Sequence, residues 1–583
     1  TSDPLNTPGD PSDDKVGSVI ITRGAQIDAQ GTADAPIIFD AIENLEALRG
    51  VDLPYDDDSD VSAQLGAGDT AKWGGVVVLG NASISLVNSS AQPVRNDVIE
   101  GTTPVGSRNA DGDNFSDLLE YGYDSLHAQD DADNSGILQY ISIRHGGFNL
   151  SADNEINGLT LGGVGTGTTI DHIEVFANED DGIEFFGGTV NCSHLSVAFC
   201  KDDGIDIDQG YNGDLQFVFV IQNNNGDNCG EWDGVDTNDG AAKVGNTAAL
   251  PSAPQIWNAT FIGGGAANGP QSGAGKDNGL YLDDNFNGAL RNSIIHDVMG
   301  YMAEFAGDGH FQSTDTQTGT KPAQAGTAGF QSITVGAIHE YDNVDNQSVV
   351  TGGGRPSDFY SVDFLDQLEN DNSEPGTDPM FATYTRDGSS NVTSIDPRPT
   401  VLNTSVQAGA PVAANYRGAF DSTDLWIANW TALDAYGLVK RPVVDVVATQ
   451  LSNVDKNAVD WSTPVLANDT TWTSDNVYYL TDRVYVPAGT TLTIEPGTKI
   501  YSTTSDPLNT PGDPSDDKVG SVIVTRGAQI IAEGTCDAPI IFDAVENLEA
   551  AYGEDINGDS VVASALGAGD TAKWGGVVVL GNA

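Results

Sequence analysis

Paired carboxylates recur at a fixed spacing in the middle of the chain. The segment DDGIE at Asp180–Glu184 returns, one fixed step later, as DDGID at Asp202–Asp206. If these segments occupy equivalent places on successive coils of a solenoid, their carboxylates lie about 4.8 Å apart and repel unless a cation or a proton intervenes. Ca²⁺ suits such groups because it prefers carboxylate and carbonyl oxygens. The spacing therefore predicts that calcium is bound by Asp180, Asp181, Asp202 and Asp203. The alternative is that these residues form a solvated acidic ladder without an ion.

A second acidic segment, NADGDNFSDLLE at Asn109–Glu120, has oxygen-bearing side chains at positions 1, 3, 5, 9 and 12 of a loop of the EF-hand type. It departs from that type at Gly112, in position 4, and at Asn114, in position 6, where glycine is expected. The alternatives are a calcium site and a plain turn rich in Asp and Asn. The predicted ligands are Asn109, Asp111, Asp113, Asp117 and Glu120. Three aspartates that follow are predicted to serve the same ion or another: Asp130, Asp131 and Asp133.

Histidine and cysteine residues cluster in the same region. His172 and His194 are separated by the same step as the paired carboxylates, so they are expected to stack, either as an ordinary ladder or as ligands of a transition metal. Cys200 and Cys229 form a candidate disulfide if the protein is secreted, with buried free thiols as the alternative, and Cys192 lies in a neighbouring coil.

Short strand-like runs would position these side chains. The runs IEVFAN, LSVAFC and FVFVIQ begin at residues 173, 195 and 217, so they follow one another at this same step. Alternation within each run sends one set of side chains inward and the other outward. Runs rich in β-branched and aromatic residues, separated by Gly, Asn and Asp at one spacing, predict an all-β protein: a parallel β-solenoid with coils of about 22 residues, loop insertions and capping segments.

The beginning of the sequence is repeated near its end. Residues 1–47 return at 504–550 with differences at five positions. Such a near copy indicates large units in tandem, because stacked units give length. The sequence starts at Thr1 without Met or a signal peptide, so we expect it to be a piece of a longer array. The predicted organisation is a β-helix unit at 1–440, a connector at 441–470, and the N-terminal cap and first coils of the next unit at 471–583.

Several motifs together resemble a group of secreted bacterial right-handed β-helix proteins, which includes giant tandem-repeat surface proteins of filament or adhesin type. The motifs are GTTLTIEPGTKI at 489–500, WGGVVVLGNA at 73–82 and DDGIEFFGGTVN at 180–191. The resemblance covers most of 1–440 and again 471–583. It implies a right-handed parallel β-helix and an extracellular location on a bacterial surface, but it specifies no activity.

Net charge and composition limit the kinds of molecule that this protein can bind. The 583 residues carry a formal net charge of −61, which excludes nucleic acid and anionic membranes as ordinary partners because both attract basic surfaces. No run of about 18 apolar residues occurs, so we expect no membrane span. The predicted partners are further copies of the protein, end to end and side by side, and polysaccharide.

Three functions fit these features. We expect a structural repeat of an extracellular surface fibre, filament or sheath, stabilised by calcium. The first alternative is an adhesin that binds polysaccharide or a host surface through loops such as 99–133 and 308–379. The second is a polysaccharide lyase or glycoside hydrolase, since paired aspartates can supply an acid and a base. The Gly-His-Gly and Arg-x-Lys motifs of polygalacturonase-type enzymes are absent, and 24 Lys and Arg residues are few for binding uronates, so the sequence favours a protein that is not an enzyme.

Overall fold

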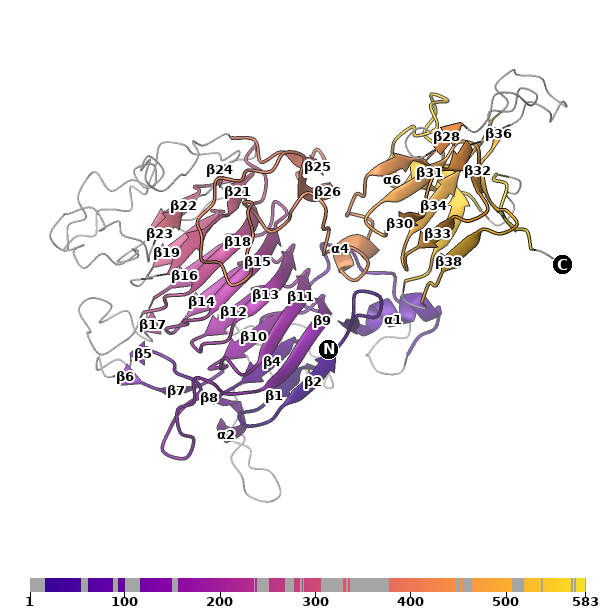
Figure 1. Ribbon diagram of the computed structural model, residues 1–583. Helices are drawn as coiled ribbons and strands as arrows, with labels where there is room; N and C mark the ends of the chain where they lie inside the picture. Colours follow the sequence, from indigo (N-terminus) through magenta and orange to yellow (C-terminus); the bar gives the residue numbers. More distant parts are fainter. Residues whose placement is uncertain are drawn as a thin grey trace. The chain divides into compact units, whose positions relative to one another are not determined.

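The regular secondary structure of the computed structural model consists almost entirely of short strands, which form two compact units (Figure 1). Unit 1 comprises Thr1–Thr32 and Ile37–Trp426, and unit 2 comprises Ala33–Pro36 and Ile427–Ala583. The structure describes residues 16–53, 61–87, 93–99, 116–148, 156–234, 236–237, 251–267, 277–283, 286, 288–305, 329–331, 334–335, 377–446, 451–453, 464–505, 518–535, 538–567, 570 and 573–581. The expected tandem arrangement of units stays a prediction.

An eight-stranded parallel sheet forms one wall of unit 1, with its strands in the order β1-β4-β10-β12-β14-β16-β19-β22. Neighbouring strands come from successive coils, so the loop between two neighbours carries the chain through the rest of the coil. The strands are β1 (Val19–Ile21), β4 (Val76–Leu79), β10 (Leu159–Gly162), β12 (Ile183–Phe186), β14 (Ile205–Asp208), β16 (Gly230–Asp233), β19 (Leu280–Asp283) and β22 (Ala303–Phe305).

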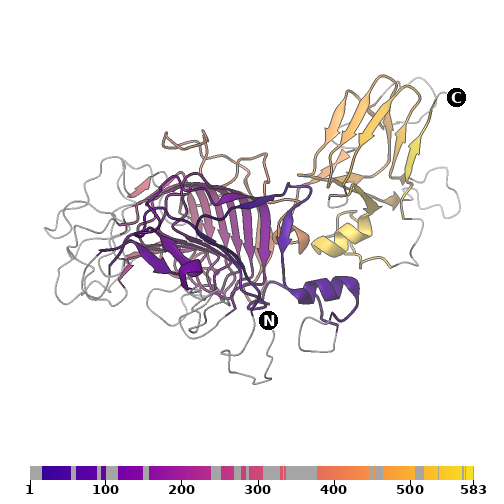
Figure 2. The ribbon, with the colours of Figure 1, turned by 90° about the horizontal axis from the view of Figure 1, so that it is seen from below.

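An eleven-stranded parallel sheet forms the opposite wall of unit 1. Its main path is β2-β9-β11-β13-β15-β18-β20-β23, and β3, β21 and β24 pair beside that path. Figure 2 shows the long strands stacked in parallel. The strands are β2 (Ile27–Gln30), β3 (Ile37–Phe39), β9 (Gly136–Arg144), β11 (Thr169–Phe176), β13 (Cys192–Ala198), β15 (Asp214–Ile221), β18 (Gln255–Ile262), β20 (Ala289–Arg291), β21 (Ile294–His296), β23 (Gly329–Gln331) and β24 (Thr334–Val335).

The long strands of this second sheet bend midway at one residue per coil. That residue takes the left-handed backbone conformation, which residues other than glycine adopt rarely. We call this set the left-handed row. Its members have φ between 49° and 60° and are Tyr140, His172, His194, Phe217, Asn258 and Asn292. The bend divides each long strand into two halves, so one coil has three straight segments around its core.

The predicted parallel β-helix is confirmed, and its period varies. Ile173 pairs with Leu195, one predicted period further along the chain. The next step differs, because Leu195 pairs with Val218 and not with Phe217. Counted between paired residues, the connection from Asp208 to Leu215 is one residue longer than the connection from Phe186 to Cys192, so Phe217 enters the left-handed row instead. Other coils are longer still, with equivalent turn residues 25 and 50 positions apart.

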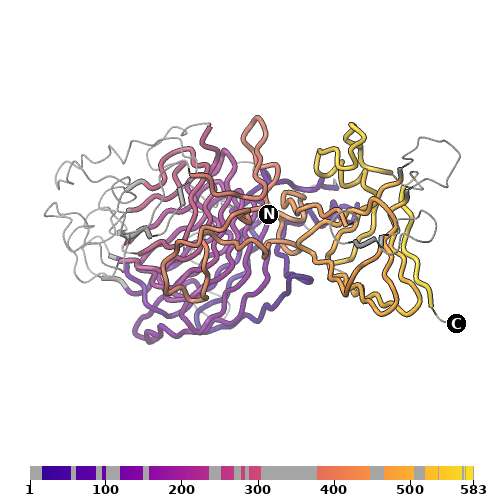
Figure 3. Tube along the Cα trace, turned by 45° about the horizontal axis from the view of Figure 1, so that its top comes forward, coloured from indigo at the N-terminus to yellow at the C-terminus, as the bar shows by residue number. Residues whose placement is uncertain are grey.

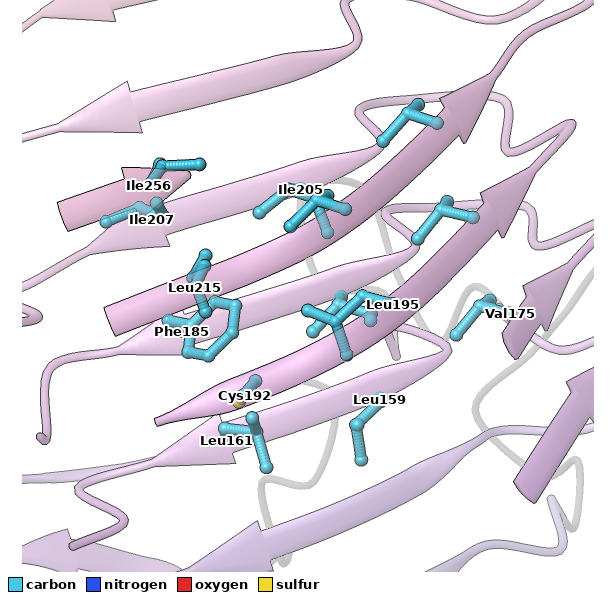
Figure 4. Packing of buried hydrophobic residues seen from close by; sticks show 14 of the residues in the cluster. Leu159, Leu161, Val175, Phe185, Cys192, Leu195, Ile205, Ile207, Leu215 and Ile256 are labelled. Carbon is cyan, nitrogen blue, oxygen red and sulfur yellow. The ribbon is translucent and has the colours of Figure 1, made fainter. Parts of the chain in front are cut away.

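The core of unit 1 lies between the two sheets and is built by alternation along each strand. Leu159, Leu161, Phe185, Ile205 and Ile207 of the eight-stranded sheet face the interior and are at most 1% exposed. Figure 4 shows them packed against residues of the facing sheet. Burying one such side chain contributes about 1.5–3 kcal/mol, so each coil adds several such contributions to the stack.

A second apolar cluster covers part of the outer face of the eight-stranded sheet. Val77 and Phe186 point away from the core and pack with Ile84 and Tyr121. Tyr121 lies on β8 (Glu120–Gly122), which pairs with β7 (Asn96–Val98), and its hydroxyl donates to Gln209 Oε1 at 2.9 Å. This outer face is therefore partly sealed from water. Nearby small elements are β5 (Leu86–Val87), β6 (Pro93–Val94), β17 (Asp236–Thr237) and the short helix α2 (Ser116–Leu119).

The last segment of unit 1 runs back across the left-handed row, and we call Asn403–Trp426 the C-terminal strap. Asn258 Nδ2 donates to the carbonyl of Tyr416 at 2.8 Å. Asn292 exchanges two hydrogen bonds with the backbone of Gln407, and Gln216 does the same with Val412. The strap thus binds several successive coils. An antiparallel hairpin precedes it, formed by β25 (Phe381–Arg386) and β26 (Val392–Pro399).

Unit 2 is a second, shorter solenoid, and Figure 3 shows its coils as a tube. Its sheets have the orders β27-β31-β34-β39, β28-β29-β32-β37-β40 and β30-β33-β38, and β35 pairs with β36. The elements are α4 (Ala432–Ala435), β27 (Val443–Asp445), β28 (Leu451–Asn453), β29 (Pro464–Leu466), β30 (Thr470–Trp472), β31 (Val477–Leu480), β32 (Arg483–Val486), β33 (Thr491–Ile494), β34 (Lys499–Ser502), β35 (Thr504–Ser505), β36 (Lys518–Val519), β37 (Ser521–Val524), β38 (Gln529–Ala532), β39 (Ile541–Ala544), α6 (Val545–Tyr552) and β40 (Val577–Val579).

The two near copies of the sequence fold alike. Helix α1 (Ile42–Arg49) in unit 1 corresponds to α6 in unit 2, and each ends at a left-handed glycine. Glu46 in α1 and Glu549 in α6 are both fully buried, and each carboxylate accepts backbone N–H groups of the loop that follows. Among the described residues, no helix has the length and apolar character needed to cross a bilayer.

Candidate functional site

A ladder of Asp and Asn side chains runs along the turns that lead into the eight-stranded sheet. Asp181 Oδ1 accepts the N–H of Asp203 at 2.8 Å, and Asp203 Oδ1 accepts the N–H of Asn228 at 2.7 Å. Asn228 and Asn278 continue the pattern toward later coils, with distances of 2.9 Å. Each side chain therefore satisfies a backbone donor of the next coil. Two members are aspartates where the later coils use asparagine, so the ladder carries acid groups that its bonding does not require.

A column of acidic side chains stands beside this ladder on the outer face of the eight-stranded sheet. Glu184 on β12 pairs in register with Asp206 on β14, and Asp206 pairs with Glu231 on β16. Alternation places them opposite the core residues Ile205 and Ile207. Strand neighbours are about 4.8 Å apart, so the column brings three carboxyl groups as close as sheet geometry allows.

The ladder and the column meet at one place. Oxygens of Asp181, Glu184 and Asp206 lie within 4.8 Å of one another. Oxygens of Asp180, Asp181 and Asp202 form a second such group, so Asp181 belongs to both. The two groups together bring three of the four predicted turn ligands close together, and we call these five residues the carboxylate site.

Burial makes the charge at this site costly. Asp181 is 9% exposed and Glu184 is 4% exposed. Loss of water raises the pKa of Asp181 well above its ordinary value, and the charges of Asp180 and Asp202 raise it further. Burial likewise raises the pKa of Asp206, and Glu184 and Asp181 add to the rise. Stacked, dehydrated carboxylates favour bound protons or a cation.

The pKa of Asp203 is also raised, in part by an acidic neighbour from the next coil. Its pKa is raised well above the ordinary value, first by burial and then by the charge of Glu231. Its remaining exposure is 4%. The carboxyl group of Asp203 is also hydrogen-bonded to the side chain of Glu231. The two groups are therefore suited to share one proton.

The donor set fits a hard divalent cation. Every side-chain ligand that the carboxylate site offers is a carboxylate oxygen, the type that Ca²⁺ prefers. One of these atoms, Asp206 Oδ1, is buried and accepts no hydrogen bond from the described residues. An ion at this position would satisfy that oxygen and offset the repulsion of Asp181 and Glu184. The residues present therefore fit calcium, which Asp181, Glu184 and Asp206 would hold, and calcium binding here stays a prediction.

The aspartates at 130, 131 and 133 lie in a hydrogen-bonded turn. Asp131 Oδ1 accepts from the backbone and hydroxyl of Ser83 at 2.9 and 2.6 Å. Asp130 Oδ1 accepts the N–H of Ala132 at 3.0 Å. Asp133 Oδ2 accepts from the hydroxyl of Ser135, and burial raises the Asp133 pKa. A role for these three residues as metal ligands stays a prediction.

The predicted EF-hand-type segment is only partly described. Asn109, Asp111 and Asp113 lie outside the described residues, and so do residues 100–115 of the first candidate adhesive loop and most of the second, 308–379. Asp117 lies in α2, a helix of four residues. Glu120 pairs with the guanidinium of Arg23 at 2.8 Å. Calcium binding at this segment stays a prediction.

The expected stacking of His172 and His194 is confirmed. The ring centroids lie 4.1 Å apart with an interplanar angle of 16°. Both Nδ1 atoms are hydrogen-bonded to the Asp171 carboxylate, at 2.8 and 2.9 Å, and Trp426 packs edge-on against both rings. Nearly parallel rings cannot aim their lone pairs at one metal ion, because each lone pair lies in its own ring plane. The geometry therefore favours a structural ladder over a transition-metal site.

The three cysteines in this region, Cys192, Cys200 and Cys229, are buried free thiols. Burial raises the pKa of each thiol. A buried thiol with a raised pKa is inert, and these side chains pack as small apolar groups. The disulfide alternative for Cys200 and Cys229 is not formed.

Sequence reasoning found the turn aspartates and left out part of the column beside them. The equivalence of Glu184 and Asp206 follows from the constant step between the first coils. The constant step does not identify Glu231, because the coil that contains Glu231 is longer than the preceding ones. The usable signal was the alternation in Gly230–Asp233, where GEWD repeats the pattern of IDID at Ile205–Asp208, with acids at the outward positions.

The fold and the carboxylate site define a parallel β-helix protein with an acidic outer face. A family model described as a pectate-lyase-like β-helix domain matches residues 62–352 and 464–565, more than half of the chain. The chain belongs to this family. The two matched segments fall in unit 1 and unit 2 respectively. Searches of curated proteins and of solved structures found no match.

Proposed function

We propose that this chain is a stiff repeat of an extracellular bacterial surface fibre, filament or sheath, joined end to end to further copies. The observation that carries the proposal is the near copy of residues 1–47 at 504–550, since both copies form equivalent strands and an equivalent helix. A solenoid gains length by adding coils, and each coil contacts only its neighbours. The net charge of −61 keeps such rods apart in salty surroundings.

Calcium is part of this proposal. An ion held by Asp181, Glu184 and Asp206 would stabilise the stack by offsetting the repulsion within the carboxylate site. Outside the cell, millimolar calcium is available, and extracellular modules bind it with dissociation constants of about 10⁻⁴–10⁻³ M. The fibre would therefore be most stable where it works.

Electron microscopy of the native material tests the structural function. We expect rods or filaments whose axial repeat equals the length of one sequence unit, which runs from Thr1 to Thr503. A protein of two or more tandem units, made recombinantly, should give rods whose length grows in proportion to the number of units. Compact particles whose dimensions do not grow with the number of units would overturn the proposal.

A carbohydrate-active enzyme is the second candidate, and the family description together with the raised pKa values favours it. Glu184 and Asp206 are adjacent carboxyl groups on the outer face of a parallel sheet, and such pairs serve as acid and base in glycan cleavage. The low exposure of Glu184 counts against substrate access. Incubation with acidic polysaccharides tests the candidate. New reducing ends or unsaturated products that disappear in Asp206→Asn would establish it, and no turnover with or without calcium would exclude it.

A further inference from the structure

The same coil occurs twice in this chain, and its two copies differ in which neighbouring strands cover them. In unit 1, β1 pairs with the following strand β4, and β2 and β3 pair with the following strand β9. In unit 2, the counterparts β37, β38 and β39 pair with the preceding strands β32, β33 and β34, and β37 also pairs with the following strand β40. Each copy thus displays a contact that the other copy lacks among the described residues.

The uncovered side of the copy in unit 1 is apolar. Leu45 in helix α1 is 39% exposed, whereas its counterpart Leu548 in α6 is 1% exposed. Val545 in α6 is fully buried, while its counterpart Ile42 is only partly buried. Helix α6 lies against β34 of the preceding coil, and this contact covers its apolar side. The exposure of Leu45 therefore reflects a missing neighbour, since the two helices have nearly the same sequence.

We propose that β1, β2, β3 and helix α1 form a docking surface for a coil of the kind formed by residues 477–502, supplied by another copy of the repeat. The inference rests on the proposed tandem arrangement and names the surface that joins successive units. The junction is then a continuous hydrogen-bonded β-helix, with no flexible linker at this point.

Unit 2 provides the template for this contact in three strand pairs. Val484 pairs with Val522, Leu492 with Ile530, and Ile500 with Phe542. The counterparts in unit 1 are the same residue types, and they are partly buried and packed at the edge of the core: Val19, Ile27 and Phe39. Val19 and Phe39 already continue into columns of apolar side chains on β4 and β9, respectively. A docked coil would extend each column by one residue in the other direction.

The differences between the copies leave the apolar character of this surface unchanged. Asp28 is replaced by Ile531, and both side chains are exposed on the outside of their strands. Ile42 is replaced by Val545, which keeps the apolar side of the helix. The contact residues of the docking coil therefore meet the same chemistry in either copy.

Hydrogen exchange tests the proposal in a chain extended at its beginning. Residues 427–503 are placed before Thr1, and the new junction reproduces the natural one because the chain after Thr503 reads TSDPLN in both places. In the 583-residue chain, we expect the α1 amides to exchange at least about tenfold faster than the α6 amides of the same molecule, after correction for sequence. In the extended chain, α1 should slow to within about threefold of α6.

Matched variants of the extended chain identify the contact. Leu45→Glu places a charge on the docking surface and should restore fast exchange in α1. Leu48→Glu is the control, because Leu48 is 83% exposed and lies off this surface, so α1 should stay protected. Fast exchange of α1 in the extended chain would overturn the proposal. Unprotected strands in the added segment would do so too, because the docking surface offers the same partners that order these strands in unit 2.

The outcome also separates this inference from the proposed function. Rods in the micrographs with an unprotected α1 would refute only the docking surface. A protected α1 without rods would support the docking surface and refute the proposed fibre function.

Discussion

Asp203 donates its backbone N–H to the side chain of Asp181 at 2.8 Å, across one coil of the β-helix. The bond orders the turn, and it also fixes two buried carboxyl groups in successive coils. Asn228 and Asn278 make the same kind of bond further along without any charge. The ladder bonds therefore do not require the carboxyl groups of Asp181 and Asp203. Replacing such a carboxyl group by an amide separates the contribution of the hydrogen bond to stability from that of the charge.

A pair of substitutions at Asp203 makes that separation. Asp203→Asn keeps the acceptor oxygen, whereas Asp203→Ala leaves the N–H of Asn228 without its partner. Because an unsatisfied buried donor costs about 1–3 kcal/mol, we expect the Ala variant to be less stable than the Asn variant by that amount. Urea unfolding without calcium gives both free energies. Equal stabilities would mean that the ladder bond contributes nothing.

Calcium should stabilise the protein through the carboxylate site. At a free concentration of 100 times the dissociation constant, one bound ion contributes about 2.7 kcal/mol, seen as a higher melting temperature that a chelator reverses. Asp206→Asn should remove most of this gain. Asp28→Asn is the control, because Asp28 is exposed and the second copy has Ile531 there. A melting temperature that is the same with calcium and with chelator contradicts the site.

The pH dependence of stability follows from the raised pKa values. Folding raises the pKa of Asp181, Asp203 and Asp206, so the folded protein binds protons more readily than the unfolded chain, in which these groups titrate near 3.8. In chelator, the free energy of unfolding should therefore increase as the pH falls from 7 through the raised values toward 3.8. Carboxyl groups with lowered pKa, such as Asp171, lose their contribution only below that range, whereas the lowered pKa values of His145, His172 and His296 oppose the increase as the pH falls below 6.5.

Calorimetry at several pH values checks this prediction. Saturating calcium should flatten the dependence, since the ion takes the place of the protons. A decline in stability from pH 7 to pH 5 without calcium would show that these carboxyl groups are not the ones that control it.

Asp171 should set the titration of His172. Burial lowers the pKa of His172, and the hydrogen bond and charge of Asp171 oppose that shift. Asp171→Asn removes the charge, so we expect the His172 pKa to fall further. An NMR titration of the ring carbons measures it. The pKa of His145, which is bonded to the carbonyl of Asp69, should not change, and a His172 pKa that rises would refute the assignment.

The repeating parts of the fold were predictable from the sequence, and the irregular parts were not. The spacing between His172 and His194 predicted a stack because both belong to coils of one length. Glu231 was missed, since an insertion lengthens its coil and breaks the spacing while the strand register is kept. Partial burial of the outer face of the eight-stranded sheet was also missed, because it involves Tyr121, which is brought over the sheet by a hairpin whose position no local pattern encodes.

The C-terminal strap gives the β-helix a mechanical property. Hydrogen bonds between coils point along the helix axis, so a pull along that axis loads them in series and would part the weakest coils first. The strap runs beside the stack and bonds to Gln216, Asn258 and Asn292 in separate coils. Tension must shear these bonds before those coils separate, so this stretch of the rod resists stretching more strongly than coils without a strap.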